Sequence, residues 1–182
     1  MMKNNRRLLF FIGLFSLFLC FFPQALVLGE TLSEYEIKSA FLYNFANFVE
    51  WPELQMSSKT EMVIGTCGNE EMFQVLKENF EGKSLRNWVI QIQSVDHVDQ
   101  ALSCDVLFIS EQSSRSQSFL ESLKDKSILT VGDSPDFLKQ GGIIAFFPDN
   151  GKIKFSINLK NARNAGIQIS SKLLWLAKKV IE

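Results

Sequence analysis

The chain has 182 residues, of which 46% are hydrophobic, 21% charged and 12% aromatic, and its formal net charge is -1. These averages are those of one globular domain, and they exclude a disordered, collagen-like or disulfide-stapled small protein. A net charge near zero also argues against a broad nucleic-acid-binding surface, which needs clustered Lys and Arg. We therefore expect no nucleic acid partner.

The chain opens with the pattern of a secretory signal peptide. Three basic residues precede an apolar run from Leu8 to Phe22, which is the usual order of a basic region followed by an apolar core. The run is short for a membrane span, which needs roughly 20 residues, although an uncleaved anchor is the alternative. We predict cleavage between Gly29 and Glu30.

This division makes residues 1–29 the signal peptide and residues 30–182 a single exported domain. The leader carries three of the 19 basic residues and none of the 20 acidic ones, so the exported domain has a net charge of -4. A domain of this length buries roughly 70% of the surface of its unfolded chain. We expect it in the periplasm.

Helix and strand patterns alternate along the exported domain. Ser33 and Glu36 form a capping box that opens the first helix, which should end near Pro52 because the residue before proline avoids the α region. Asn69 is placed to cap a second helix that Gly82 closes. Strands are predicted over residues 61–67, 88–93, 105–110 and 127–131, with further helices over 98–102, 113–124 and 135–140.

The pattern changes near the end of the domain. Asn150-Gly151 separates two apolar runs and predicts a β-hairpin, and Asn158 then caps a final helix that extends to Val180. Gly166 either weakens this helix or marks a break into two pieces. The whole order predicts an α/β fold: a three-layer α-β-α sandwich, with a mainly parallel sheet, a C-terminal antiparallel hairpin strand and a long C-terminal helix.

Two cysteines, Cys67 and Cys104, belong to the exported domain. An even number of cysteines in an oxidising compartment favours a disulfide, and two buried thiols are the alternative. No C-x-x-C pair is present, so a thioredoxin-like redox motif is not expected.

No group of residues predicts catalysis. His97 is the single histidine, so neither a zinc hydrolase site nor a serine triad at Gly132-Asp133-Ser134 has the base that it needs. The glycines around Cys67 do not match a dinucleotide or phosphate-binding loop. We expect no catalytic residues, no metal and no cofactor, which leaves binding as the function.

Several blocks of sequence are distributed over residues 34–181: YEIKSAFLYNF comes first, followed by FVEWP, VIG, CDVLFIS, ILTVGDSPDF, GGII, KFSIN and AGIQISSKLL. Together these blocks resemble the YfiR-like family of exported proteins. They occur in the family's order and cover nearly the whole exported domain.

The resemblance implies a non-enzymatic periplasmic regulator. Such proteins restrain an inner-membrane diguanylate cyclase by binding its periplasmic domain, so that cyclic-di-GMP output and biofilm formation respond to conditions in the envelope. The resemblance also implies a homodimer and a redox-sensitive disulfide between Cys67 and Cys104, whereas a second family pair near the hairpin is absent here. Contact with the membrane is expected only through the partner or an uncleaved leader.

Two binding sites are candidates. The expected partner surface combines an apolar part of the C-terminal helix with the end of the first helix. Leu173, Leu174 and Trp175 are three consecutive apolar residues and cannot all face one core, so part of this helix should be exposed. Trp175 itself is expected to pack. Its residues are Tyr43, Phe48, Trp51, Ile169, Leu173 and Leu174, for each of which a core position is the alternative.

The alternative function is a small-molecule-sensing module that feeds a membrane histidine kinase or another receptor. Ligands of parallel α/β sheets bind at the carboxyl ends of the strands. The candidate ligand pocket is therefore lined by Gly65, Asn69, Ser110, Asp133 and Ser134.

Overall fold

The first helix, α2 (Glu34–Asn47), begins at the predicted capping box. In the computed structural model, which describes residues 32–52, 59–113 and 116–182, Ser33 Oγ accepts a hydrogen bond from the Glu36 N–H at 3.1 Å. The Glu36 carboxylate in turn accepts from the Ser33 N–H. The predicted signal peptide lies outside the described residues, so its cleavage stays a prediction.

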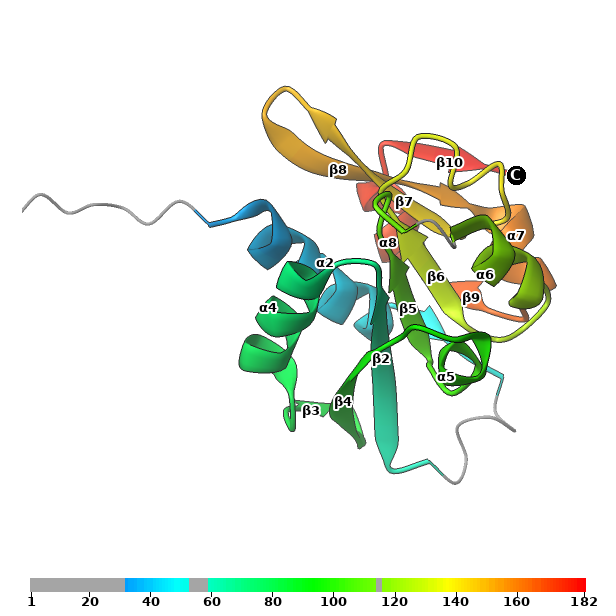
Figure 1. Ribbon diagram of the computed structural model, residues 1–182. Coiled ribbons are helices and arrows are strands. Elements are labelled where there is room, and N and C mark those ends of the chain that lie inside the picture. The colour runs from blue at the N-terminus through cyan, green and yellow to red at the C-terminus, as the bar shows by residue number, and fades with distance from the viewer. Residues whose placement is uncertain (1–31, 53–58, 114–115) are drawn as a thin grey trace, which may run out of the picture. The chain divides into compact units, whose positions relative to one another are not determined.

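Eight strands form one mixed sheet, in the order β10-β8-β7-β6-β5-β2-β4-β3. The neighbours from β4 to β7 are all parallel, and β7 and β8 form the predicted antiparallel hairpin (Figure 1). The α/β fold with a mainly parallel sheet is thus confirmed. The strands are β2 (Glu61–Cys67), β3 (Ser84–Leu85), β4 (Trp88–Ser94), β5 (Val106–Ile109), β6 (Leu129–Gly132), β7 (Ile144–Asp149), β8 (Lys152–Asn158) and β10 (Lys179–Ile181).

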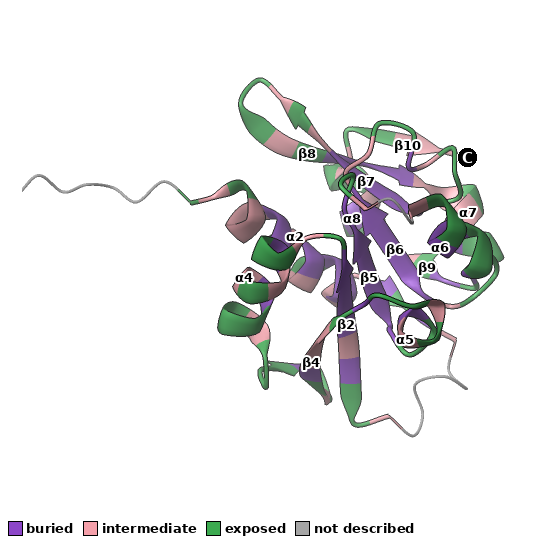
Figure 2. Ribbon diagram, viewed as in Figure 1, coloured by how far each residue is buried: buried purple, intermediate pink, exposed green. Residues whose placement is uncertain are grey.

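Helices cover both faces of this sheet, and successive strand residues alternate between the two faces. Val106 and Phe108 of β5 pack into the same core as α2 and α4 (Glu70–Phe80), whereas Leu107 and Ile109 pack with α5 (Val98–Leu102) and α6 (Ser116–Ser122). Figure 2 shows the central strands buried and the outer faces of the helices exposed. A strand buried on both faces explains the continuous apolar run in β5.

The prediction of one long C-terminal helix is wrong. Residues 159–181 form α7 (Leu159–Asn164), β9 (Gln168–Ile169), α8 (Ser171–Leu176) and the edge strand β10. Gly166 adopts φ +70°, a left-handed conformation that ends a helix and that favours glycine. The break turns the chain so that β9 pairs antiparallel with β1 (Val49–Glu50).

The short helix predicted after Asp133 is also absent, and residues 135–140 form turns. The reason is packing around Phe137, whose side chain is fully buried. A Cβ at Gly132 would lie 2.4 Å from the Phe137 ring, and one at Gly142 would lie 2.2 Å from it. The two glycines therefore make room for the ring, which fixes the turn between β6 and β7.

Candidate functional site

The carboxyl ends of β2, β5 and β6 lie at one edge of the sheet, as the parallel pairing requires. Both polar atoms of the Asn69 side chain form hydrogen bonds within the fold. The oxygen accepts from the Met72 N–H at 2.7 Å and caps α4, and the amide nitrogen donates to Tyr35 Oη at 2.8 Å. Ser110 is buried and its hydroxyl accepts from the Gln112 N–H. These polar groups hold the loops that surround the strand ends.

Asp133 is the central charged group at this edge. One carboxylate oxygen accepts from the ammonium of Lys38 at 2.6 Å, and the other accepts from the Glu111 N–H at 2.7 Å. The Lys38 ammonium also contacts Glu34, at 2.5 Å. One side chain therefore joins α2, the loop after β5 and the end of β6.

Lys38 was not among the residues selected from the sequence, although its side chain is only 4% exposed. Burial is the largest single cause and opposes the charge, but the hydrogen bonds to Asp133 and Glu34 and the charges of these carboxylates together hold the pKa of Lys38 above its ordinary value. The sequence could have indicated this burial, because Lys38 lies one helical turn before Leu42 and therefore on the same, buried face of α2.

A pocket of about 220 Å³ opens beside this ion pair. Asp133 lies in its wall, as the sequence predicts, together with Lys38, Glu34 and Glu111. The remaining walls are apolar and come from the β7–β8 hairpin: Phe146, Phe147, Pro148 and Ile153. A charged end and an apolar wall suit a small solute that has both kinds of group.

Gly65 does not belong to this pocket, which corrects the prediction. It lies inside β2, where a Cβ would meet the Sγ of Cys104 at 2.5 Å, so its role is to allow close packing. Asn69, Ser110 and Ser134 do not line the pocket either. The Ser134 Oγ is buried and has no hydrogen-bond partner among the residues that the structure describes.

The predicted disulfide between Cys67 and Cys104 is not formed. Cys67 ends β2 opposite Ile109, the last residue of β5, whereas the residue after Cys104, Asp105, bonds through its N–H to the carbonyl of Val63. Residues 105 and 109 are roughly 13 Å apart along the strand. Strand register therefore keeps the Cα atoms of the two cysteines farther apart than the about 7 Å that a disulfide tolerates.

The two thiols should behave as buried groups. Burial, followed by the nearby charge of Asp105, raises the pKa of Cys104 to about 12, and only a thiolate reacts readily. We expect the native exported domain to react very slowly with a thiol reagent at neutral pH and to show two thiols after unfolding. Its melting temperature should be the same with and without dithiothreitol; a clear decrease in reductant would contradict the structure.

Most of the predicted partner surface is core. Leu173 is 2% exposed and Trp51 7%, and Tyr43 stacks on Phe80 with ring centroids 5.0 Å apart. Phe48, Ile169 and Leu174 are half-buried and pack against the same core. The structure does bring residues 48–51 and 168–174 together, through the β1–β9 pair.

The exposed apolar side chains of α8 are instead Trp175, which is 85% exposed, and Leu176, which is 54% exposed. Trp175 was expected to pack. Ser170 caps this short helix and Leu173 points into the core, so Trp175 lies roughly 200° around the helix axis from Leu173. An open groove of about 400 Å³ lies beside it, lined by Phe48, Ser171, Lys172, Trp175 and Leu176.

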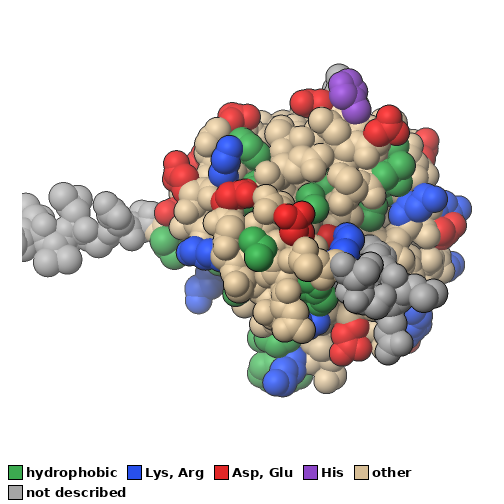
Figure 3. Space-filling model, turned by 90° about the horizontal axis from the view of Figure 1, so that it is seen from below, with side chains coloured by type: hydrophobic (Ala, Val, Ile, Leu, Met, Phe, Trp, Pro, Cys, Tyr) green, Lys and Arg blue, Asp and Glu red, His purple; other side chains and the backbone are tan. Residues whose placement is uncertain are grey.

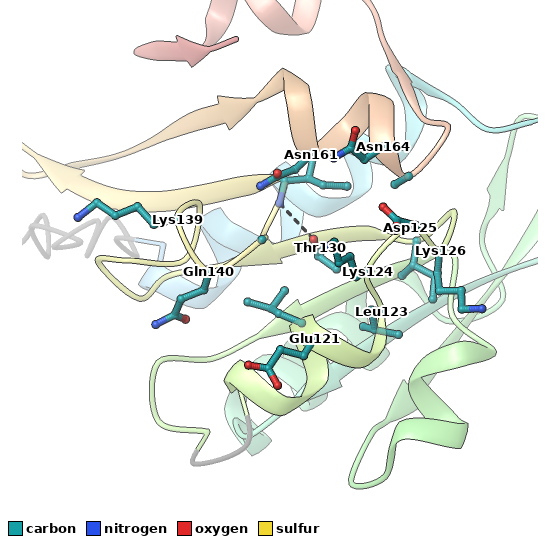
Figure 4. A pocket seen from close by; sticks show the side chains of 15 residues that line it. Glu121, Leu123, Lys124, Asp125, Lys126, Thr130, Lys139, Gln140, Asn161 and Asn164 are labelled. Carbon is teal, nitrogen blue, oxygen red and sulfur yellow. Dashed lines mark hydrogen bonds between the residues drawn. The ribbon is translucent and has the colours of Figure 1, made fainter.

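A second groove of about 330 Å³ lies between the end of α6 and α7. Figure 4 shows Asn161 and Asn164 on one side, Glu121 on the other, and Lys124, Asp125 and Lys126 together at one end. Its inner polar groups hold the fold: Thr130 Oγ1 accepts from the Ile143 N–H at 3.1 Å, and the Asn161 amide donates to two carbonyls. We assign this groove a structural role.

Charged side chains of both signs are interspersed over the face shown in Figure 3. His97 is exposed and precedes α5. Within the described ranges, no helix is long and apolar enough to cross a bilayer.

This α/β domain has a mixed sheet with helices on both faces, a largely buried Lys38–Asp133 ion pair at the strand ends and a short helix with two exposed apolar side chains. The chain belongs to the YfiR/HmsC-like family (DUF4154), whose family model matches residues 35–178. This match confirms the resemblance seen in the sequence. The family is one of periplasmic regulatory proteins of a diguanylate cyclase, rather than of enzymes.

One solved structure shows the same kind of fold. A conserved domain protein from Vibrio cholerae O1 biovar El Tor matches with a TM-score of 0.54 and 13% identity over 82% of this chain and 60% of that chain. An ABC domain in complex with L-Trp from Streptococcus pneumoniae matches with a TM-score of 0.46 and 14% identity over 66% of this chain and 55% of that one. The chain thus spans less than two thirds of either protein. Comparison with curated proteins gives no match.

Proposed function

We propose that this protein modulates an inner-membrane diguanylate cyclase by binding the cyclase's periplasmic domain. The observation that supports it is the exposure of Trp175 and Leu176 beside the groove at Phe48. An exposed tryptophan contributes little to folding, whereas tryptophans at the centre of interfaces carry a large share of binding energy. In this proposal the protein acts in the periplasm after loss of residues 1–29.

Binding regulates a cyclase only if the protein prefers one of the cyclase's conformations. The shift in the conformational equilibrium equals the difference between the two affinities, so a 100-fold preference changes the population ratio by the same factor. No covalent chemistry is needed for this action.

The test is direct binding between the exported domain and the periplasmic domain of a membrane diguanylate cyclase encoded beside it, measured by calorimetry. We expect a complex with the wild-type protein and a much weaker one after Trp175→Ala. Absence of binding at micromolar concentrations would contradict the proposal. The same protein in an ultracentrifuge tests the homodimer that the family resemblance implies.

The pocket at Asp133 supports a second function, the sensing of a small solute that tunes the partner contact or feeds another membrane receptor such as a histidine kinase. We expect a library of periplasmic solutes to contain a compound that raises the melting temperature, since a ligand at 100 times its dissociation constant stabilises by about 2.7 kcal/mol. Asp133→Asn should abolish this shift because it removes the carboxylate that pairs with Lys38 in the pocket wall. A shift that persists in this variant would place the ligand elsewhere.

A further inference from the structure

The pocket beside Asp133 has a wall in which negative charge predominates. Its ionisable side chains, among the residues that the structure describes, are Lys38, Glu34, Glu111 and Asp133. At neutral pH one positive and three negative charges leave this wall with a net charge of -2. The lysines at the tip of the adjacent hairpin, Lys152 and Lys154, do not line the pocket. The charge that a ligand meets here is therefore negative.

The single cation of this described wall is already bound by the protein. The Lys38 ammonium donates to Asp133 at 2.6 Å, contacts Glu34 at 2.5 Å and lies 5.2 Å from the centre of the Tyr35 ring. Its side chain is only 4% exposed. An anionic ligand would have to compete with two carboxylates for an ammonium that solvent hardly reaches. The pocket therefore disfavours an anion.

Two of the carboxylates, in contrast, are accessible. The Glu34 side chain is 58% exposed, although one of its oxygens contacts Lys38. Glu111 is also exposed, and it is the N–H of its backbone, rather than its carboxylate, that bonds to Asp133. Both carboxylates can accept hydrogen bonds from an ammonium group that enters the pocket from solvent.

The rest of the wall limits the size and polarity of the ligand. Phe147 and Ile153 of the hairpin are half-buried and Pro148 is exposed, so their apolar surface is open to the pocket. The volume of about 220 Å³ is below the roughly 300–1,000 Å³ of most ligand sites. Such a space holds an apolar body of the size of one ring or a short alkyl chain.

We propose that this pocket binds a small organic cation, whose ammonium group meets Glu34 and Glu111 while its apolar body lies against the hairpin. This inference rests on the solute-sensing function proposed above, and it specifies the charge and the size of the solute. The net charge of -4 on the exported domain also favours the approach of a cation.

The experiment compares three probes that share a phenyl ring and differ in charge: phenethylamine, phenethyl alcohol and hydrocinnamate. Each is titrated into the exported domain, and changes in backbone amide NMR shifts locate the site. We expect phenethylamine to shift the amides around Lys38 and Ile153, the alcohol to bind more weakly and hydrocinnamate not to bind. Salt should weaken the binding of phenethylamine.

Matched variants test the two accessible carboxylates. Glu34→Gln and Glu111→Gln each remove one charge and keep the shape of the side chain, and each should weaken phenethylamine binding about threefold, as expected for an exposed ion pair. The control is Glu121→Gln, an exposed carboxylate in the groove of Figure 4, for which we expect wild-type binding. Equal weakening by all three variants would show attraction to the overall charge of the domain and would overturn the inference.

The outcomes separate this inference from the function on which it rests. If a neutral or anionic solute binds at Asp133 and phenethylamine does not, the solute is not a cation, while the sensing function stands. If phenethylamine and the alcohol bind equally well, the inference is also wrong. If neither the probes nor the library of periplasmic solutes gives a ligand at Asp133, both the inference and the sensing function fail.

Discussion

Asp133→Ala is expected to lower the free energy of unfolding by about 3 kcal/mol, because it leaves the buried Lys38 ammonium with only the exposed Glu34 carboxylate as a partner. Asp133 is 13% exposed at its side chain and Lys38 4%, so neither charge is well solvated when the other is gone. In a domain of this size the loss corresponds to roughly 6–12 °C in melting temperature. Chemical unfolding monitored by circular dichroism measures it directly.

The control for this prediction is Asp136→Ala. Asp136 forms its ion pair with Lys139 on the same segment, but both side chains are exposed, at 57% and 82%, and exposed pairs contribute little. We expect no measurable change there. In the Lys38→Met background, Asp133→Ala should cost less than in the wild type; equal costs in the two backgrounds would show that the two side chains are not coupled.

The ion pair also sets the direction of a pH dependence. The folded-state pKa of Lys38 lies above its unfolded value, so its contribution to stability is complete below the unfolded pKa and is lost as the pH rises through the folded pKa. The wild type should therefore lose stability on the alkaline side faster than Lys38→Met does.

Trp175→Ala is expected to weaken partner binding by about 30-fold, which corresponds to about 2 kcal/mol. The side chain is 85% exposed, so the stability of the isolated domain should change by less than about 0.5 kcal/mol. Loss of binding without loss of stability is the result that distinguishes an interface residue from a core residue. Calorimetric titration and thermal melting of the same variant supply both numbers.

Leu102→Ala is the matched control. Leu102 is 44% exposed and belongs to α5, on the face of the sheet opposite α2 and α4. Its replacement should leave the dissociation constant unchanged. Equal weakening by both substitutions would indicate that binding depends on general surface hydrophobicity.

The main elements of the fold could be predicted from local patterns. The cap at Ser33, the cap at Asn69 and the hairpin at Asn150 each depend on residues close together in the chain, and the structure confirms all three. The short strands β1 and β9 were missed because two-residue strands carry no periodicity and are defined by their partner.

The candidate sites were harder because they depend on contacts between distant residues. Lys38 and Asp133 are 95 positions apart, and nothing local marks a lysine that will be buried by a loop so far away. The disulfide was predicted wrongly for the same reason: an even number of cysteines does not reveal the strand register that keeps Cys67 and Cys104 apart. The sequence predicted exposed apolar residues near α8 but not which ones they are. The chain breaks at Gly166, and α8 begins again at Ser171, so Leu173 is buried and Trp175 and Leu176 are exposed.

Helix α2 touches both candidate sites at once. Lys38 near its start meets the pocket at Asp133, and Phe48, which follows its last turn, lines the groove at α8. A helix of this length is a stiff rod of roughly 21 Å. If a solute in the pocket and the cyclase at the groove both bind as proposed and both act through α2, linkage requires that each change the affinity of the other by the same factor.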